Sequence, residues 1–455
     1  MAYSLWQKTL EDLIEIVDIE KYEFCKRGTY GARCYPNKRK FKSKYYDDII
    51  NNKMSYEELK KTNDFIYNAD VKSLYPASMA GVAGLLNVNY PTGKSRWSDT
   101  PEEEYNKNKY GFYEINFTAP KDIIIPVFPR KTSVGGLEWS LFDGSGVYTN
   151  VEIKNALSVG YKVNFINRCL VWDTSSDKVF KNYVEKYYKM KEEAEKDNNK
   201  VMRSIAKLLL NAMYGKTLQR AIFETTNIIN NYNQLLDFFK DYEITDINTL
   251  SENKLILTGK TLNKESKITK PCQLGAFVLS YSREIMLNYM KIIDPTLKTH
   301  VFSYTDTDSL HIMGEHYKKF KDLGMIKDSL GYLDNDISND GVIIYENNLG
   351  PKNYIYEYIN SKNEVSINDK ATMKSKGIPQ RCLKYDMYDN YKTIEPVEFS
   401  GLKKKHINLT KDDINKGVPL FSIVNNTQTR TFNKTEWCGM VLNDNNFYPK
   451  GFNKI

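Results

Sequence analysis

Two aspartates stand one residue apart in the segment VFSYTDTDSLHIM, at 301–313. Branched and aromatic apolar residues flank the polar TDTD, a pattern that predicts two short strands joined by a hairpin turn. Like charges this close repel each other, so Asp306 and Asp308 predict a divalent cation at the turn. A calcium loop is excluded because Leu310 and His311 stand where a third oxygen ligand and a glycine are needed. An ordinary surface turn remains the alternative for this segment alone.

A further aspartate stands at the end of a predicted strand. The segment FIYNADVKSLYPASM, at 65–79, predicts a strand that ends at Asp70, then a turn, then a helix that begins near Pro76. A two-metal site for phosphoryl transfer needs carboxylates from separate chain segments around ions about 4 Å apart. Asp70 and Asp308 are therefore the candidate pair for such a site.

A predicted helix that ends in KLLLNAMYG carries its polar residues on one face, because they recur at steps of four, four and three. This face holds Arg203, Lys207, Asn211 and Tyr214, and the apolar residues predicted to point elsewhere are Leu208, Leu209 and Ala212. The polar face is either an ordinary solvent-exposed surface or a binding site for a triphosphate, with room for a base beside Gly215. Lysine suits the second role because it binds phosphate as a point charge.

Composition bounds the class of protein. The 455 residues carry a net charge of +8, and 41% of them are hydrophobic, which predicts a folded protein with a mild preference for a polyanionic partner. The six cysteines form no CxxC pair and only four histidines accompany them, which argues against a zinc module or a disulfide framework. No signal peptide and no apolar run of about eighteen residues is present, so we expect a cytoplasmic protein without a membrane span.

The remaining segments predict a mixture of helices and strands. Strands broken by prolines are expected in 111–128, two antiparallel helices in 178–215, short β pieces in 217–270 and a helix in 273–292. The tail from about residue 352 mixes short strands with basic clusters such as LKKKH, and its elements are not placed.

Three motifs resemble those of a known family. DVKSLYP at 70–76, KLLLNAMYG at 207–215 and YTDTDS at 304–309 look like motifs A, B and C of the family B DNA polymerases, in the order of that family. The segments between them resemble the two terminal regions of its protein-primed subgroup, found in phages, adenoviruses and linear plasmids. The resemblance covers nearly the whole chain and implies an α+β right-hand polymerase fold with palm, fingers and thumb.

The resemblance also implies a division of the chain. The expected parts are a lead and first palm segment at 1–92, an insert resembling terminal region 1 at 93–179, fingers at 180–216, an insert resembling terminal region 2 at 217–270, a second palm segment at 271–380 and a thumb with the tail at 381–455.

The resemblance implies a role for each residue that matches a motif. Asp70 and Asp308 would hold two Mg²⁺ ions, or Mn²⁺, with help from the Val71 carbonyl, while Asp306 would assist without being indispensable to both ions. The nucleotide-binding residues would be Tyr75 under the sugar, Lys191 and Lys207 on the triphosphate, Asn211, and Tyr214 over the nascent pair. The ring of Tyr75 would clash with a 2′-hydroxyl, which favours deoxynucleotides.

The resemblance also implies which residues contact DNA. PKNYIYE resembles the KxY motif at the primer end, and GTYGARC resembles the YxGG template-binding segment, with Ala32 in place of a glycine. In VLSYSREI, an arginine matches a DNA-contacting position, although Leu279 stands where a threonine is common. The DNA-binding residues implied are Tyr30, Gly31, Arg33, Gly215, Arg283, Thr307, Lys352 and Tyr354.

The family's proofreading exonuclease is not expected within this sequence, because the segment ahead of Asp70 is too short to hold it. The triplet DIE at 18–20 imitates the first exonuclease motif, and we interpret it as a charge pair on a helix surface. The expected partners are template-primer DNA, dNTPs and a terminal protein as primer. Three explanations stay open for the exonuclease: it lies on a separate chain, it has been lost, or the sequence is an excised core. Two alternatives stay open: a polymerase that uses ordinary nucleic-acid primers, and a catalytically idle DNA-binding subunit of a replication complex.

Overall fold

The computed structural model describes residues 1–455 apart from 134, 252–253, 390–396, 407–420, 431–437 and 454–455, and it gives no side-chain placement between 389 and 437. Helices and strands alternate through these residues, as the sequence predicted for an α+β protein. Within the described ranges, no helix has the length and apolar content that crossing a bilayer requires.

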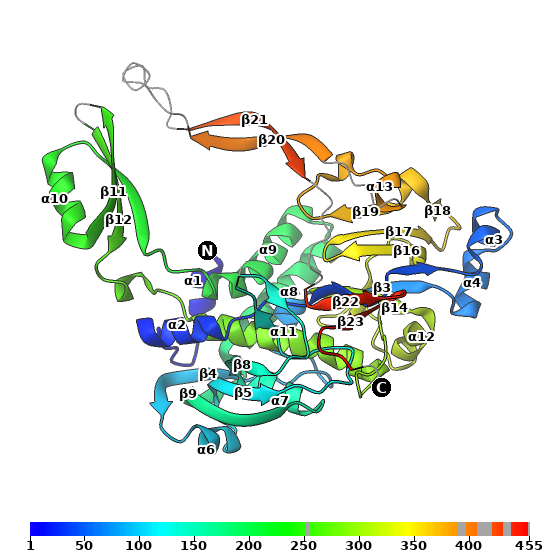
Figure 1. Cartoon of the computed structure of the whole chain (residues 1–455), viewed down its shortest axis with the longest axis horizontal. Helices are drawn as coiled ribbons and strands as arrows, with labels where there is room; N and C mark the ends of the chain where they lie inside the picture. Colours follow the sequence, from blue (N-terminus) through cyan, green and yellow to red (C-terminus); the bar gives the residue numbers. More distant parts are fainter. Residues whose placement is uncertain (134, 252–253, 390–396, 407–420, 431–437, 454–455) are drawn as a thin grey trace.

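A sheet of ten strands forms the centre of the molecule (Figure 1). Its main path runs in the order β1 (Cys34–Pro36), β13 (Tyr304–Asp306), β14 (Ser309–Met313), β3 (Ile66–Val71), β16 (Val342–Gly350), β17 (Asn353–Ile359) and β18 (Val365–Ser366). Three strands pair beside this path: β2 (Lys40–Lys42) with β16, β15 (Leu333–Asn335) with β3, and β19 (Thr372–Ser375) with β17. Segments far apart in the sequence therefore meet at β3.

Helices pack against this sheet from several parts of the chain. The long helix α11 (Cys272–Ile293) is buried along most of its length and contacts α5 (Leu74–Ala80), so it lies in the core rather than on the surface. Three short helices flank the sheet: α3 (Tyr46–Ile50), α4 (Tyr56–Thr62) and α12 (Gly314–Asp322). A capping box formed by Ser55 and Glu58 begins α4, because each side chain bonds the other's backbone N–H.

Residues 90–176 form a second, four-stranded sheet. Its order is β4 (Tyr90–Ser98), β9 (Lys162–Ser176), β5 (Tyr110–Thr118) and β8 (Gly144–Thr149), accompanied by α6 (Pro101–Asn106), α7 (Asn150–Leu157) and the short pair β6 (Arg130–Lys131) and β7 (Leu137–Glu138). The prediction of several strands in 111–128 was wrong for its second half. Residues 119–128 are buried without forming a strand, since Pro120 and Pro126 lack the N–H that a ladder needs.

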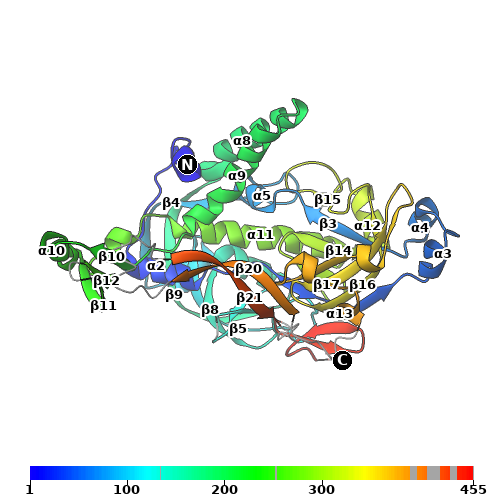
Figure 2. The same ribbon diagram turned by 90° about the horizontal axis from the view of Figure 1, so that it is seen from above.

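The predicted helical pair is α8 (Lys178–Lys196) and α9 (Lys200–Thr217), which project from the body in Figure 2. The predicted apolar face of α9 was partly wrong, because Leu208 is 67% exposed. The buried face instead runs through Ala206, Leu209, Leu210, Met213 and Thr217. The spacing of apolar residues predicted the helix correctly, but the predicted apolar face is rotated slightly from the face that is buried.

The insert at 217–270 is a small unit with its own core. It contains β10 (Glu224–Ile229), α10 (Tyr232–Asp241), β11 (Tyr242–Ser251), β12 (Lys254–Thr261) and the 3₁₀ turn η1 (Glu265–Lys267). Helix α10 and strand β11 were not predicted. Ile229, Phe238 and Leu257 form the core of the unit, which lies at one end of the molecule (Figure 1).

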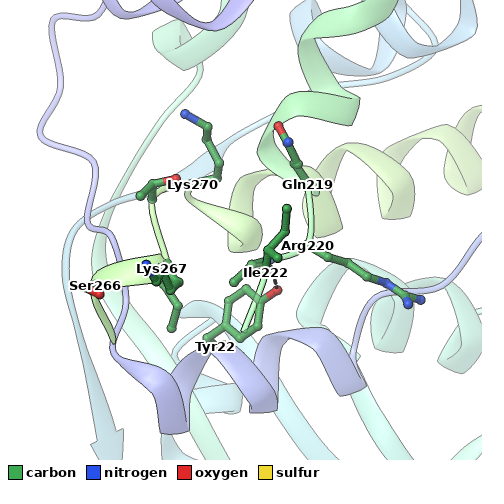
Figure 3. Close-up of a pocket in the computed structure, with 10 residues that line it drawn as sticks. Tyr22, Gln219, Arg220, Ile222, Ser266, Lys267 and Lys270 are labelled. Carbon is green, nitrogen blue, oxygen red and sulfur yellow. Dashed lines mark hydrogen bonds between the residues drawn. The ribbon is translucent and has the colours of Figure 1, made fainter. Parts of the chain in front are cut away.

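A hollow of about 400 Å³ lies where this insert joins the body (Figure 3). Residues 219–222 enter the insert on one side of the hollow and 266–270 leave it on the other. The Tyr22 hydroxyl accepts a 3.2 Å hydrogen bond from the Ala221 N–H, so α2 (Ile19–Arg27) fixes the entering segment.

The N-terminus adds α1 (Ala2–Gln7), and the C-terminal part adds several short elements. These are η2 (Asn368–Lys370), η3 (Gln380–Cys382), α13 (Asp386–Asp389), the hairpin of β20 (Val397–His406) and β21 (Phe421–Arg430), and the hairpin of β22 (Met440–Asn443) and β23 (Asn446–Pro449). The LKKKH cluster falls in β20, and its side chains lie outside the described ones.

Candidate active site

The register of the central sheet brings Asp70 and Asp308 together. Strand β14 pairs antiparallel with β3, with Ser309 opposite Asp70. The N–H of Val71 donates a 2.7 Å hydrogen bond to the carbonyl of Asp308. The predicted hairpin of β13 and β14 is confirmed, and it turns at Thr307 with a positive φ of 63°. Both predicted carboxylates therefore stand at one end of adjacent strands.

Burial and like charges act on these two carboxylates. Burial raises the pKa of Asp70 to about 8, and the negative charges of Asp308, Asp336 and Asp334 add to the effect. Burial also raises the pKa of Asp308, with contributions from Asp306 and Asp336. Lys207 opposes the shift at Asp70 and Lys352 opposes the shift at Asp308, but neither lysine cancels it. Carboxylates whose charge the protein compensates only in part are typical of sites arranged for a cation.

The donor set fits Mg²⁺ or Mn²⁺, which prefer carboxylate and carbonyl oxygens. In the part of the chain that the structure describes, no three His, Cys, Asp or Glu side chains converge closely enough to enclose a metal. Magnesium is commonly bound by one or two carboxylates together with substrate phosphates. The arrangement therefore suits an ion that arrives with a phosphate ligand better than a closed structural site.

The aspartate at the other end of the hairpin turn has a different environment. Asp306 accepts a 2.6 Å hydrogen bond from the Lys352 ammonium, and the Thr307 hydroxyl also donates to it. Burial works against the charge of Lys352, but the bond to Asp306 outweighs burial and raises the pKa of Lys352. Asp306 is thus neutralised by the protein, whereas Asp308 is not.

The sequence analysis missed two further carboxylates and a lysine at this site. Strand β15 pairs with β3 so that Asp334 lies opposite Asp70, and Asp336 follows two residues later. Lys72 forms ion pairs with Asp334, at 3.8 Å, and with Asp328. The run LDNDIS reads as a turn, so only the sheet pairing could place Asp334 here.

Two aromatic rings meet between the central sheet and α9. The rings of Tyr75, on α5, and Tyr214, on α9, stack with centroids 3.9 Å apart and an interplanar angle of 20°. The helix that carries Tyr75 begins at Leu74, two residues earlier than predicted, after Ser73 with a positive φ of 55°. On the same stretch of α9, Asn211 is exposed, and no atom lies within 4 Å of a Cβ built on Gly215. The structure thus brings together the tyrosines that the sequence analysis placed around a nucleotide.

Lysines from both helices face this region. Burial lowers the pKa of Lys191, and the positive charges of Lys72, Arg203 and Lys207 lower it further, opposed by Glu195. Lys191 is 6% exposed on α8, and its ammonium lies 5.2 Å from the centre of the Tyr188 ring. Lys207 is exposed and its positive charge acts on Asp70. Like charges gathered in this way are costly unless an anion joins them.

The residues predicted to contact template DNA are mostly engaged by the protein itself. Tyr30 is buried and stacks on Tyr148 with ring centroids 5.2 Å apart. Arg33 is also buried, donates to the Pro126 carbonyl at 3.2 Å and lies 4.5 Å from the Trp139 ring.

Arg283, on α11, has a complete set of partners inside the protein. Its guanidinium pairs with Glu152 at 2.8 Å and donates to the carbonyls of Tyr30 and Gly31. Direct DNA contact by Gly31 stays a prediction. Arg283 thus holds the backbone of the Gly31 segment, while the side chains of Tyr30 and Arg33 pack within the protein.

The predicted primer-end residues lie beside the hairpin turn. Lys352 has a positive φ of 54°, and its N–H donates a 2.7 Å hydrogen bond to the Tyr304 hydroxyl. The rings of Tyr354 and Tyr304 lie 4.6 Å apart. The KxY segment and the YTDTDS hairpin are therefore one packed unit.

The DIE triplet has a structural role, as interpreted from the sequence. Asp18 is the N-cap of α2, where its carboxylate accepts a 2.9 Å hydrogen bond from the Lys21 N–H. Glu20 pairs with Arg168. An N-cap carboxylate satisfies a free backbone donor and needs no metal.

Sequence comparison assigns the chain to a family. The model for DNA polymerase type B, organellar and viral, matches residues 52–296, just over half of the chain, so the chain belongs to this family. The matched segment contains Asp70, Lys191 and Lys207 and ends before Asp308.

Two similar sequences are fungal polymerases. A DNA polymerase of Kluyveromyces lactis is 31% identical over 262 residues, which is 55% of this chain and 24% of that protein. A probable DNA polymerase of Ascobolus immersus is 28% identical over 274 residues, 58% of this chain and 21% of that protein. The chain therefore spans about a quarter or less of the length of these relatives.

A solved structure shows the fold. Phi29 DNA polymerase complexed with primer-template DNA and incoming nucleotide substrates superposes with a TM-score of 0.62 at 15% identity, over 94% of this chain and 66% of that chain. The predicted right-hand polymerase fold is confirmed.

Proposed function

We propose that the chain is a DNA-directed DNA polymerase that joins a deoxynucleotide to a primer 3′-hydroxyl and releases pyrophosphate. The observation that carries this proposal is the meeting of Asp70 and Asp308 at the ends of β3 and the β13 and β14 hairpin, in a chain of the type B family. Two Mg²⁺ or Mn²⁺ ions would supply nucleophile activation and charge stabilisation there.

In this proposal the chain's own residues bind and orient the reactants. Asp70, Asp308 and the Val71 carbonyl hold the ions, and Lys191 and Lys207 hold the triphosphate as point charges. Tyr75 lies under the sugar and Tyr214 covers the nascent pair. The stacking of these two rings on each other means that they must separate when a nucleotide enters.

The DNA-binding residues divide into direct contacts and supports. Lys352, Tyr354 and Thr307 stand at the hairpin turn, where the primer end would meet the carboxylates. Gly215 lies on the exposed side of α9, where it would meet DNA, and Asn211, exposed on the same helix, would bind the incoming nucleotide. Gly31 meets the template, held in place by Arg283, while Tyr30 and Arg33 pack within the protein. Binding to phosphates rather than bases predicts little sequence preference and a strong salt dependence.

We assign the palm, fingers and thumb subdomains to the segments that the sequence analysis gave them. The segments 1–92 and 271–380 form the palm, 180–216 the fingers and 381–455 the thumb with the tail. The inserts at 93–179 and 217–270 support priming by a terminal protein and displacement of the non-template strand, because they occupy the places of the two terminal regions. Proofreading would reside outside these residues, on the same polypeptide or a separate chain, and the work would take place in the cytoplasm of a host cell.

The test is extension of a labelled DNA primer with Mg²⁺ and all four dNTPs, on a template that carries a downstream blocking strand. Long products are expected, and Asp308→Asn should abolish them while sparing DNA binding. Products that stop at the block would retain the polymerase and remove strand displacement. DNA binding without any extension would favour the idle-subunit alternative.

A further inference from the structure

Lys72 stands next to the candidate metal ligands but has no role in the assignments above. It follows Val71 in the turn between β3 and α5. Two backbone hydrogen bonds hold it against the loop 327–332: its N–H donates to the Tyr332 carbonyl at 2.9 Å, and its carbonyl accepts from the Gly331 N–H at 2.8 Å. The backbone of Lys72 is therefore fixed, and only the rotation of its long side chain can change its partner.

The loop 327–332 that holds Lys72 lies against α8, because Leu330 and Tyr188 line one cavity. The positive charge of Lys72 therefore acts on the cationic group that includes Lys191. This charge lowers the pKa of Lys191 together with Arg203 and Lys207. Arg203 pairs with Glu195 at 3.2 Å. Among the described side chains, no carboxylate lies within 4.0 Å of the Lys191 or Lys207 ammonium. The positive side chains around Lys191 therefore outnumber the carboxylates that pair with them.

The present partners of Lys72 are weak ones. Asp328 forms an ion pair with it but is 74% exposed at its side chain, and Asp334 lies farther away at 3.8 Å with 52% exposure. Exposed ion pairs contribute little because water competes with both charges. A polyphosphate carries several charges on one small group and forms stronger charge-assisted hydrogen bonds with ammonium groups.

We propose that Lys72 is a further triphosphate-binding residue, and that Asp328 is the counter-ion it gives up when the nucleotide binds. This inference rests on the proposed polymerase function. It makes three lysines, from the β3 turn, α8 and α9, converge on one polyphosphate. It also gives the loop 327–332 a function, since that loop presents the carboxylate that neutralises Lys72 when the site holds no nucleotide.

A purely structural role for the Lys72 and Asp328 pair is the competing explanation. The two explanations predict opposite effects of Asp328→Asn on phosphate affinity. If Lys72 binds phosphate, Asp328→Asn frees it and tightens binding by about threefold, while Lys72→Met weakens binding by about tenfold. If the pair only anchors the loop, both substitutions weaken binding. Lys72→Arg keeps the charge and should retain most of the affinity.

The experiment is calorimetric titration of inorganic tripolyphosphate into the whole chain at saturating Mg²⁺, followed by measurement of KM and kcat for dNTP. Lys72→Met should weaken tripolyphosphate binding and raise KM with a much smaller change in kcat. Lys327→Met is the matched control, because Lys327 lies on the same loop with its ammonium 3.7 Å from the Tyr332 ring. It should leave both values unchanged.

The results separate this inference from the proposed function. Unchanged tripolyphosphate binding in Lys72→Met, or weaker binding in Asp328→Asn, overturns the role of Lys72. If Lys72→Met melts at a lower temperature, Lys72→Arg and Asp328→Asn decide the question instead. Absence of extension by the unaltered chain overturns the proposed function, while the tripolyphosphate titration still tests Lys72.

Discussion

Asp70 and Asp308, at the candidate active site, are half-buried carboxylates of the same charge. Glu152, on α7, and Arg283, on α11, are buried side chains whose charges are opposite. Glu152 and Arg283 are each 4% exposed at the side chain and lie 2.8 Å apart, and the other guanidinium nitrogens donate to protein carbonyls and to the Ser280 hydroxyl. Asp70 and Asp308 are both negative, and each raises the cost of burying the site.

The difference distinguishes a candidate ligand-binding group from a group whose charges the protein itself satisfies. A buried charge with a complete set of protein partners needs nothing from outside, and removing one partner is costly. A crowded, uncompensated pair is stable only if protons or cations join it. The sequence resemblance assigned functional roles to members of both groups, and the structure shows that Arg283 has a carboxylate partner within the protein.

The largest effect expected is at the uncompensated pair. Asp308→Asn should reduce primer extension by more than about a thousandfold, because it removes a ligand of ions that supply several kcal/mol of stabilisation. Asp306→Asn should cost only about tenfold, because Lys352 already neutralises Asp306. Extension rates at saturating dNTP measure both. Equal losses in the two variants would remove the distinction between the two aspartates.

The neutral pair should respond through stability. Glu152→Gln leaves the Arg283 charge buried without a carboxylate and should lower the free energy of unfolding by about 3 kcal/mol. Denaturant unfolding measures this. Glu193→Gln is the control, since Glu193 pairs with Lys189 on the exposed surface of α8 and should change stability by less than about 0.5 kcal/mol. Similar losses in the free energy of unfolding for the two variants would contradict a structural role for the buried pair.

The uncompensated pair also predicts a stabilising substitution. The pKa of Asp70 in the folded, metal-free chain is about 8, above the ordinary value of 3.8, so the folded state binds a proton that the unfolded state releases. Stability therefore falls as pH rises from about 4 to about 8, and the loss is complete above that range. In EDTA, Asp70→Asn should melt at least about 2 °C higher than the unaltered chain at pH about 9, with a smaller gain at pH about 5.

The metal dependence of that melting temperature is the internal control. If Asp70 holds an ion as proposed, Mg²⁺ should stabilise the folded, unaltered chain and remove its disadvantage relative to Asp70→Asn. A lower melting temperature for Asp70→Asn in EDTA at high pH would show that Asp70 is compensated by the protein after all.

The smallest effect expected is at the exonuclease-like triplet. Asp18→Ala removes the N-cap of α2 and should lower the free energy of unfolding by about 1 kcal/mol without changing primer extension. Glu20→Ala, which breaks an exposed pair with Arg168, should cost less. A change in the degradation of primer ends in either variant would place Asp18 and Glu20 in the ligand-binding group.

Local patterns predicted much of the site. The turn of the hairpin and the helical pair of α8 and α9 are confirmed, and the strand predicted to end at Asp70 ends one residue later, at Val71. Each of these features depends on residues near one another in the chain. Spacing alone could not tell that Leu208 faces solvent or that residues 119–128 form no strand. Those outcomes depend on which neighbours cover each face.

The sequence by itself determined which residue types could do chemistry. Aspartates at a strand end and a hairpin turn, and the polar helix face with Lys207 and Tyr214, were predicted from short-range spacing, whereas the KxY segment was assigned by resemblance to the family. Their agreement with family B motifs supplied the fold, which the structural comparison confirms.

Only the tertiary structure decided which charges meet and which are compensated. The pairing of β14 and β15 with β3 sets Asp308 and Asp334 beside Asp70, and packing of α11 gives Arg283 its carboxylate. Such contacts join segments far apart in the chain, and their electrostatic consequence depends on distance and burial in space rather than on spacing in sequence.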